Sequence, residues 1–195
     1  ARDVFAALLA RPDQDPEIAE SAQSGLFYAL VESEALDEAR ALARQTLAQT
    51  SPQLWLPGGA AAEPNDHWPA ARRDKALADY YSDRLADAQA ELEAMLALGA
   101  GDQNTRIALA NVYRSRGWPR RAADELRIAQ AADHPLRPVL LLAQTGVAMD
   151  LQDWDTAEAL TTDLYRRFPQ EAWARRALRS WQVARRPELR IEAGW

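Results

Sequence analysis

Apolar residues recur along this chain with a helical spacing. Apolar positions three or four residues apart fall on one side of an α-helix, which then buries that side. The segment 104–135 has two such stretches, separated by Gly117 and Pro119. Small and large side chains alternate within them, at Leu109, Ala110, Tyr113, Ala122, Leu126 and Ala129. The pattern predicts two amphipathic helices joined by a tight turn.

The same pattern returns at a nearly constant interval. Ala122 has counterparts at Ala88, 34 residues earlier, and at Ala157, 35 residues later. A further counterpart, Ala39, lies 49 residues before Ala88, which leaves room for one period and a 15-residue insertion. A period of this length is typical of helix-pair repeats, in which each pair buries its apolar face against its neighbours.

We therefore predict an all-α fold, a right-handed helical solenoid of the tetratricopeptide type with about four helix pairs and a capping helix. As one domain over 1–195, it is expected to comprise pairs near 20–52, 69–101, 103–135 and 138–169, an insertion at 51–69 and a capping helix at 171–184. Four prolines exclude a continuous helix from the insertion. Gly117 is expected to end its helix, and Pro119 to begin the next.

Repeat counting places a carboxylate at one buried position. A step of 34 residues back from Tyr113 reaches Asp79, with Tyr80 and Tyr81 directly after it. Because burial of an unpaired carboxylate is costly, we expect a turn one residue shorter. Such a turn buries Tyr80 and leaves Tyr81 facing outward.

Charge and composition narrow the classes of function. The formal net charge is −6, made up of −11 before residue 166 and +5 from there on. The acidic part of the chain, before residue 166, is called here the acidic body. Its charge disfavours the binding of nucleic acid and suits a neutral or cationic partner. There is no cysteine, and the apolar runs are far shorter than the ~20 residues of a membrane-spanning helix. The start at Ala1, without Met, is expected of a fragment of a longer protein.

The inventory of reactive side chains indicates that the chain is not an enzyme. His67 and His134 lie far apart in the repeats, and no nucleophile or metal-binding motif accompanies them. Gly58 and Gly59 lack the strand and helix start of a phosphate-binding loop. An enzymatic alternative would need two carboxylates in a cleft, and no motif singles out such a pair. We expect no metal and no cofactor.

The first helices of the pairs are expected to line a concave surface where partners bind. Their outward positions give the candidate partner- or polymer-binding residues Tyr28, Glu32, Arg73, Tyr81, Asn111, Arg114 and Asp150. Tyrosines beside carboxylates suit a sugar or an amine-bearing polymer, since aromatic faces attract CH groups and cations. The alternative for each residue is an ordinary exposed helix position.

Tryptophans flank the insertion at Trp55 and Trp68. A long ordered loop often carries a function, but the same residues could dock the loop onto the helices. The other tryptophans in the repeats are expected in the core or at its rim: Trp118, Trp154, Trp173 and Trp181.

Several short segments are more specific than the repeat alanines. They are Pro64-Asn-Asp-His-Trp68, Thr105-Arg-Ile-Ala-Leu-Ala110, Arg116-Gly-Trp-Pro-Arg-Arg-Ala122, Leu151-Gln-Asp-Trp154 and Glu188-Leu-Arg-Ile191. In this combination the chain resembles, over its whole length, the periplasmic tetratricopeptide region of outer-membrane porins that export poly-β-1,6-N-acetyl-D-glucosamine.

The resemblance implies a periplasmic domain that docks a periplasmic polysaccharide de-N-acetylase and guides the partly deacetylated polymer to the pore. It also implies that residues 188–195 approach an outer-membrane β-barrel outside this chain. The partly deacetylated polymer is cationic, in agreement with the acidic body. The alternative is a general tetratricopeptide adaptor that clamps the carboxylate of a peptide, for which Arg73, Asn111 and Arg114 are available.

Overall fold

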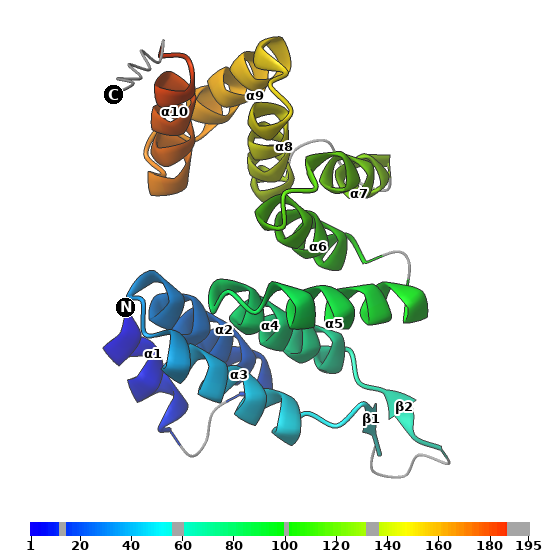
Figure 1. The fold of residues 1–195 in the computed structure, drawn as a ribbon. Helices are drawn as coiled ribbons and strands as arrows, with labels where there is room; N and C mark the ends of the chain where they lie inside the picture. Colours follow the sequence, from blue (N-terminus) through cyan, green and yellow to red (C-terminus); the bar gives the residue numbers. More distant parts are fainter. Residues whose placement is uncertain (12–14, 56–60, 100–101, 132–136, 187–195) are drawn as a thin grey trace, which may run out of the picture. The chain divides into compact units, whose positions relative to one another are not determined.

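The computed structural model describes residues 1–11, 15–55, 61–99, 102–131 and 137–186. The helices are α1 (Arg2–Leu9), α2 (Pro16–Glu32), α3 (Leu36–Gln49), α4 (His67–Tyr81), α5 (Leu85–Leu98), α6 (Gln103–Ser115), α7 (Pro119–Ala131), α8 (Pro138–Asp150), α9 (Trp154–Arg167) and α10 (Ala172–Ala184) (Figure 1). Within these residues the only strands are the two-residue β1 (Gln53–Leu54) and β2 (Glu63–Pro64). The prediction of an all-α fold is confirmed.

The chain divides into two compact units, Ala1–Ala100 and Gly101–Trp195, called here the first and the second unit. In the first unit each helix packs on the next, and α2 also contacts α4. In the second unit α6 contacts α8 and α8 contacts α10, in addition to the contacts between successive helices. The first helices of the pairs thus lie side by side within each unit. A single solenoid over 1–195 stays a prediction.

The turns inside the four helix pairs have the same geometry. Each contains one residue with a positive φ, between 58° and 76°: Glu34, Asp83, Gly117 and Gln152. The next backbone amide donates a hydrogen bond to the carbonyl five residues earlier, as from Trp118 to Tyr113 at 2.8 Å. This is the pattern of a helix that ends in a left-handed residue. Gly117 ends α6 and Pro119 begins α7, as predicted.

The repeat alanines are buried between the helices. Ala39, Ala88, Ala122 and Ala157 are each at most 1% exposed, and all four lie in the second helix of a pair. A methyl group is a side chain small enough to let a neighbouring helix pack closely. The predicted burial of these residues is confirmed.

A short helix, α1, that the repeat pattern did not predict covers the start of the first unit. It packs on α2, where Gly25 faces the ring of Phe5. A Cβ atom at Gly25 would lie 2.5 Å from Phe5 ring carbons. The glycine is therefore a close-approach position, because any larger residue would push α1 away.

The ends of the insertion are held together by a short antiparallel ribbon. Gln53 pairs with Pro64 and Leu54 with Glu63. Buried Asn65 then donates from its side chain to the Ser51 carbonyl at 2.6 Å and accepts from the His67 amide at 3.1 Å. Asn65 thereby fixes the point where α4 begins. Gly58 and Gly59 lie outside the described residues.

The expectation that a shorter turn buries Tyr80 in place of Asp79 was wrong, because this carboxylate is buried and paired. Asp79 is only 3% exposed, whereas Tyr80 is half-buried. Lys75 Nζ lies 3.0 Å from its Oδ2, and the Nε atoms of Arg40 and Arg84 lie 3.5 Å and 3.7 Å from its Oδ1. Three cations from α3, α4 and the turn before α5 compensate the charge, so a shorter turn is not needed. Tyr81 does face outward, as predicted.

The last helix, α10, closes the described part of the second unit. Trp181 of α10 is buried against Ala148 and Ala157, and Ala174 and Ala177 pack on Leu164. The arginines of α10 leave the opposite side polar. His134 and the segment 188–195 lie outside the described residues. Among the described residues, no helix is both long and apolar enough to cross a membrane.

Candidate functional site

A groove in the first unit brings together part of the predicted site. It has a volume of about 400 Å³ and lies between α2 and α4, with the end of α3 as its third wall. Tyr28 comes from α2, and His67, Arg73 and Asp74 come from α4. These residues share a groove because α2 and α4 are adjacent first helices of the repeat.

The tyrosines of this region stay protonated over a wide pH range. Burial raises the pKa of Tyr28, the negative charge of Asp74 raises it further, and Arg73 opposes this effect. The pKa of Tyr81 is raised to about 12, mainly by burial and then by Tyr28 and Tyr80. Both residues are partly exposed, 43% for Tyr28 and 38% for Tyr81. At neutral pH both tyrosines therefore keep neutral hydroxyl groups on partly exposed side chains.

The chemistry of this groove is that of binding. The phenol hydroxyl of Tyr28, Ser24 and Gln23 offer donors and acceptors, and Asp74 adds a carboxylate to the same groove. Among the described residues, no group of three or more His, Asp or Glu side chains could hold a metal ion. The arrangement suits hydroxyl and ammonium groups of a polar ligand.

The second unit brings together another part of the predicted site. Arg114 of α6 reaches across to α8, where its Nε lies 2.6 Å from Oδ2 of Asp150. Its guanidinium also covers Gly146, because a Cβ atom there would overlap it. Asn111 lies half-buried one turn before Arg114 on α6. Arg114 is thus engaged within the unit, and an incoming carboxylate would have to compete with Asp150.

The remaining predicted residues have separate surroundings. Glu32 is exposed at the C-terminal end of α2, and Trp55 is 74% exposed after β1. Trp68 is half-buried, with the Arg72 guanidinium 4.7 Å from its ring centroid. Arg72 in turn donates from Nε to Glu91 of α5 at 2.6 Å. Trp68 thus takes part in packing α4, whereas a binding role for any of these side chains stays a prediction.

Sequence reasoning missed Asp74, the carboxylate beside Tyr28. A signal for it was present, because Asp74 and Tyr81 are seven residues apart on one helix and so share a face. Position 74 was passed over because repeat offsets select one position per turn, and the neighbouring Arg73 was selected instead.

No family model matches the chain. The chain is 32% identical over 176 residues to the poly-beta-1,6-N-acetyl-D-glucosamine export protein of Escherichia coli strain K12, and equally to that of Escherichia coli O157:H7. The similarity covers 90% of this chain but only 22% of those proteins. The chain therefore spans less than a quarter of the length of these relatives.

Solved structures with the same fold are tetratricopeptide and pilus-assembly proteins. A thermophilic tetratricopeptide protein of Thermus thermophilus has a TM-score of 0.67 at 16% identity, over 93% of this chain and 88% of that one. PilW, a type IV pilus biogenesis factor, has a TM-score of 0.57 at 17% identity, over 91% and 74%. At such identities the likeness shows the fold alone, which is that of tetratricopeptide repeats. None of these relatives is named as an enzyme.

Proposed function

We propose that this tetratricopeptide chain, homologous to a part of an exporter of poly-β-1,6-N-acetyl-D-glucosamine, serves in the export of that polymer. It acts as a periplasmic scaffold that docks the polysaccharide de-N-acetylase and guides the partly deacetylated polymer to the outer-membrane pore. The observation that carries this proposal is the 32% identity over 90% of the chain.

The charge of the first unit supports the binding of a cationic polymer. This unit has 17 acidic and 8 basic residues, a net charge of −9. Removal of acetyl groups converts neutral acetamides into ammonium groups, which an acidic surface attracts. A single exposed charge pair contributes only about 0–1 kcal/mol. Affinity therefore arises from many contacts along the polymer.

The groove between α2 and α4 offers such contacts. Asp74 and the ring of Tyr28 line it together, so a glucosamine unit could place its ammonium near the carboxylate and its CH face on the ring. The pKa of Tyr28 is raised, so its hydroxyl remains a donor to sugar oxygens. The same groove holds Gln23 and Ser24 for further hydroxyl contacts.

A general adaptor that binds a peptide carboxylate is the second candidate. Arg73 in the first unit and Arg114 in the second are its cationic residues. The ion pair between Arg114 and Asp150 at 2.6 Å is against it, because a peptide carboxylate would have to displace Asp150. The net negative charge of the first unit repels such a ligand as well.

The proposal is tested by calorimetric titration of the 195-residue chain with partly deacetylated and with fully acetylated oligomers, at low and high salt. Binding of the deacetylated oligomer is expected to be the tighter at low salt and to weaken at high salt. Asp74→Asn is expected to weaken it several-fold, by about the energy of one hydrogen-bonded charge. The matched control is Asp37→Asn, since Asp37 is a fully exposed acid of α3 in the same unit.

Absence of binding to either oligomer would overturn the guidance of polymer by this chain. Docking of the de-N-acetylase would then be the remaining role, and titration of the chain with the purified enzyme measures it directly. Absence of both interactions would overturn the proposal.

A further inference from the structure

The last helix of the second unit, α10, carries positive charges and no negative ones. The stretch 172–186 contains five arginines and no acidic residue. The second unit as a whole has a net charge of +3, so its other residues together have a net charge of −2. The excess of positive charge in this unit thus comes from one helix and the two residues after it.

The outer face of α10 gathers part of this charge. The inner face packs on α8 and α9 through Ala174 and Trp181, and among the described residues α10 contacts no other helix. Arg176, Arg179 and Val183 are three or four residues apart, so they share a face. They line a surface depression of about 470 Å³ whose walls come from α10 alone.

Three of the five arginines have no partner among the described residues. Arg175 donates to the carbonyl of Gln170 at 2.6 Å, and Nη1 of Arg185 lies 3.1 Å from Oε1 of Glu158. The other three make no hydrogen bond or ion pair with the described part of the chain: Arg176, Arg179 and Arg186. Like charges three or four residues apart on a helix repel each other, so an anion from outside the unit stabilises this face.

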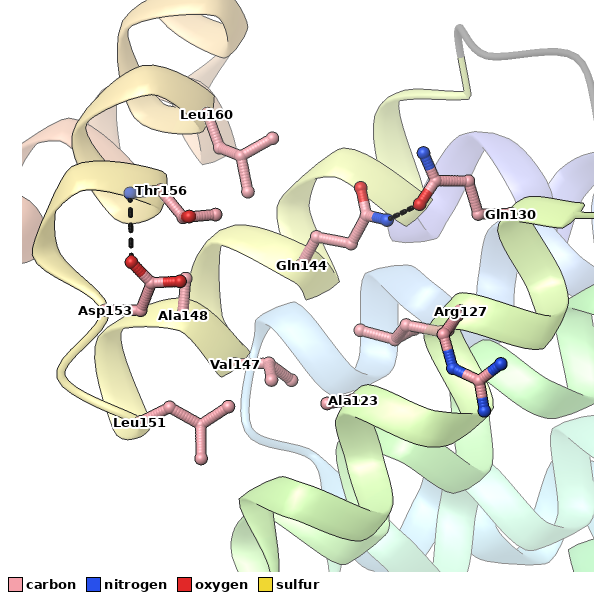
Figure 2. Close-up of a pocket in the computed structure, with 11 residues that line it drawn as sticks. Ala123, Arg127, Gln130, Gln144, Val147, Ala148, Leu151, Asp153, Thr156 and Leu160 are labelled. Carbon is pink, nitrogen blue, oxygen red and sulfur yellow. Dashed lines mark hydrogen bonds between the residues drawn. The ribbon is translucent and has the colours of Figure 1, made fainter.

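The groove between α7, α8 and α9 shows the contrast within the same unit (Figure 2). Its volume is about 390 Å³. Nε2 of Gln144 donates to Oε1 of Gln130 at 2.9 Å, and Asp153 accepts from a backbone amide of α9 at 3.3 Å. Arg127 lies 3.5 Å from Asp124 on its own helix. The charges of this groove are thus compensated inside the unit, whereas those of the outer face of α10 are not.

An apolar side chain lies among the unpartnered arginines. Val183 is 61% exposed, four residues after Arg179 and three before Arg186. Helices that lie on a membrane surface combine cations with apolar side chains that enter between the headgroups. The guanidinium fork of arginine matches the oxygens of a phosphate. Because the larger apolar face of α10 is buried in the unit, attraction to a membrane is mainly electrostatic.

We propose that the outer face of α10 binds the headgroups of an anionic phospholipid membrane. Arg176, Arg179 and Arg186 contact lipid phosphates, and Val183 rests between the headgroups. The helix has 13 residues and is about 20 Å long, so its face spans several lipids. This inference goes beyond the proposed function, because it concerns the attachment of the second unit to a lipid surface and not the polymer.

An acidic protein surface is another anionic partner, but this face suits it less. Protein interfaces take most of their binding energy from aromatic and arginine anchors that fill well-packed pockets. The aromatic residues of α10 are turned inward, since Trp181 is buried and the Trp173 ring lies 5.2 Å from that of Phe168. Holding several long arginines in one geometry costs conformational entropy. Mobile lipid headgroups can instead arrange themselves around these side chains.

The test is co-sedimentation of the whole chain with vesicles, at low and high salt. One set of vesicles contains phosphatidylcholine alone, and the other contains equal parts of phosphatidylcholine and phosphatidylglycerol. Binding is expected to the anionic vesicles only, and it is expected to weaken at high salt. The variant Arg176→Gln with Arg179→Gln and Arg186→Gln removes the three unpartnered charges and keeps good helix formers. It is expected to bind about 100-fold more weakly, as for three charges near the lipid surface.

The matched control removes three other exposed arginines, by Arg44→Gln, Arg120→Gln and Arg127→Gln on α3 and α7. The net charge of the chain changes by the same amount, so only the position of the lost charges differs. Binding within about twofold of the parent chain is expected, because charges far from the contact are screened. Circular dichroism checks that both variants are folded.

Nuclear magnetic resonance locates the contact. Lipids with a nitroxide on the headgroup broaden the signals of nearby methyl groups, so the Val183 methyl signals are expected to broaden in anionic bicelles that contain such lipids. Val139 is the reference, because it is 56% exposed and lies on α8. Equal broadening at both residues would contradict a contact through α10.

The other outcomes identify a different occupant or none. Absence of binding to the anionic vesicles overturns the proposal, and so does equal binding by the parent chain and the triple variant of α10. Displacement of the vesicles by inorganic phosphate at the lipid concentration would overturn the membrane in favour of a single anion. Self-association without lipid that the triple variant loses, measured by analytical ultracentrifugation, would overturn it in favour of the acidic first unit of a second copy. The polymer titrations of the proposed function are independent of each of these results.

Discussion

The two units share a repeat but differ in the charge of their surfaces. The first has 8 basic and 17 acidic residues, net −9, and the second has 15 basic and 12 acidic residues, net +3. Their cores are built alike, with a fully buried alanine in the second helix of each pair. Since the buried alanines and the turn geometry recur in both units while the net charge differs, the helix-pair fold does not depend on the sign of that charge. The charge of the surface is then free to differ between the units.

The contrast extends into the core at one repeat position. In the first unit Asp79 occupies it, surrounded by Arg40, Lys75 and Arg84. In the second unit Tyr113 occupies it, and its hydroxyl accepts a hydrogen bond from Arg121 Nη2 at 2.9 Å. An ion cluster and an aromatic ring thus fill equivalent places. Removing the polar group from each measures how differently the two cores are held.

The largest effect is expected from Asp79→Ala. The substitution leaves the cations of the cluster without their common partner, and Arg40 Nε is a buried donor that makes no hydrogen bond. Loss of one partner of a buried ion pair costs about 3–5 kcal/mol. We expect about 3 kcal/mol here, because Arg40 and Lys75 keep some contact with solvent. Urea unfolding followed by circular dichroism measures the loss in free energy of unfolding.

The matched change in the second unit is Tyr113→Phe. It removes one hydroxyl and keeps the ring that Arg121 covers at 4.3 Å, so a loss of about 1 kcal/mol is expected. Equal losses in the two variants would contradict the view that the first unit depends on the ion cluster.

The repeat position of Asp79 and Tyr113 also shows how much of the core can be predicted from the sequence. Repeat counting placed Asp79 correctly, and Lys75, four residues before it, was visible as a helical neighbour. Arg40 was not, because it belongs to the preceding helix pair and is separated from Asp79 by the insertion. Part of the ion pairing that compensates the buried carboxylate of Asp79 thus comes from a residue that is distant in the sequence.

The same limit applies to the grooves. The repeat offsets predicted that Tyr28, Arg73 and Tyr81 lie on the face formed by the first helices of the pairs, and Tyr28 and Arg73 line one groove. They could not predict the meeting of Gln130 and Gln144, which depends on how the end of α7 crosses α8. Nor did they predict α1, whose docking depends on the contact of Phe5 with Gly25. The periodicity predicts which residues share a face of one helix. Which residues of two helices meet depends on how the helices cross in the folded chain.

The pH dependence of the first unit is a second way to sharpen the comparison. The folded chain holds the pKa of Tyr81 at about 12, whereas an unfolded tyrosine has a pKa of about 10. The folded state keeps the proton that the unfolded state loses, so this contribution to stability is complete below pH 10 and disappears as the pH rises through 12. Tyr81→Phe is expected to flatten the fall in unfolding free energy over this interval.

Unfolding in urea at stepped alkaline pH, with tyrosinate absorbance as a second signal, checks the effect. Tyr165→Phe is the matched control, because Tyr165 lies in the second unit with the same exposed fraction of 38%. An equal flattening in the control would contradict the assignment to Tyr81.

The smallest effect is expected at the turns, where both units use a left-handed residue. Asp83 in the first unit has φ 59° and Gly117 in the second has φ 76°. A side chain in this conformation costs roughly 1 kcal/mol relative to glycine.

Asp83→Gly is therefore expected to raise the free energy of unfolding by a few tenths to about 1 kcal/mol, after the greater entropy of glycine in the unfolded chain is subtracted. Gly117→Ala is expected to lower it by about 1 kcal/mol, although no atom lies within 4 Å of the added Cβ. Opposite signs in urea unfolding would show that the backbone conformation, and not local packing, sets the energy of these turns; a loss of stability in both variants would contradict this.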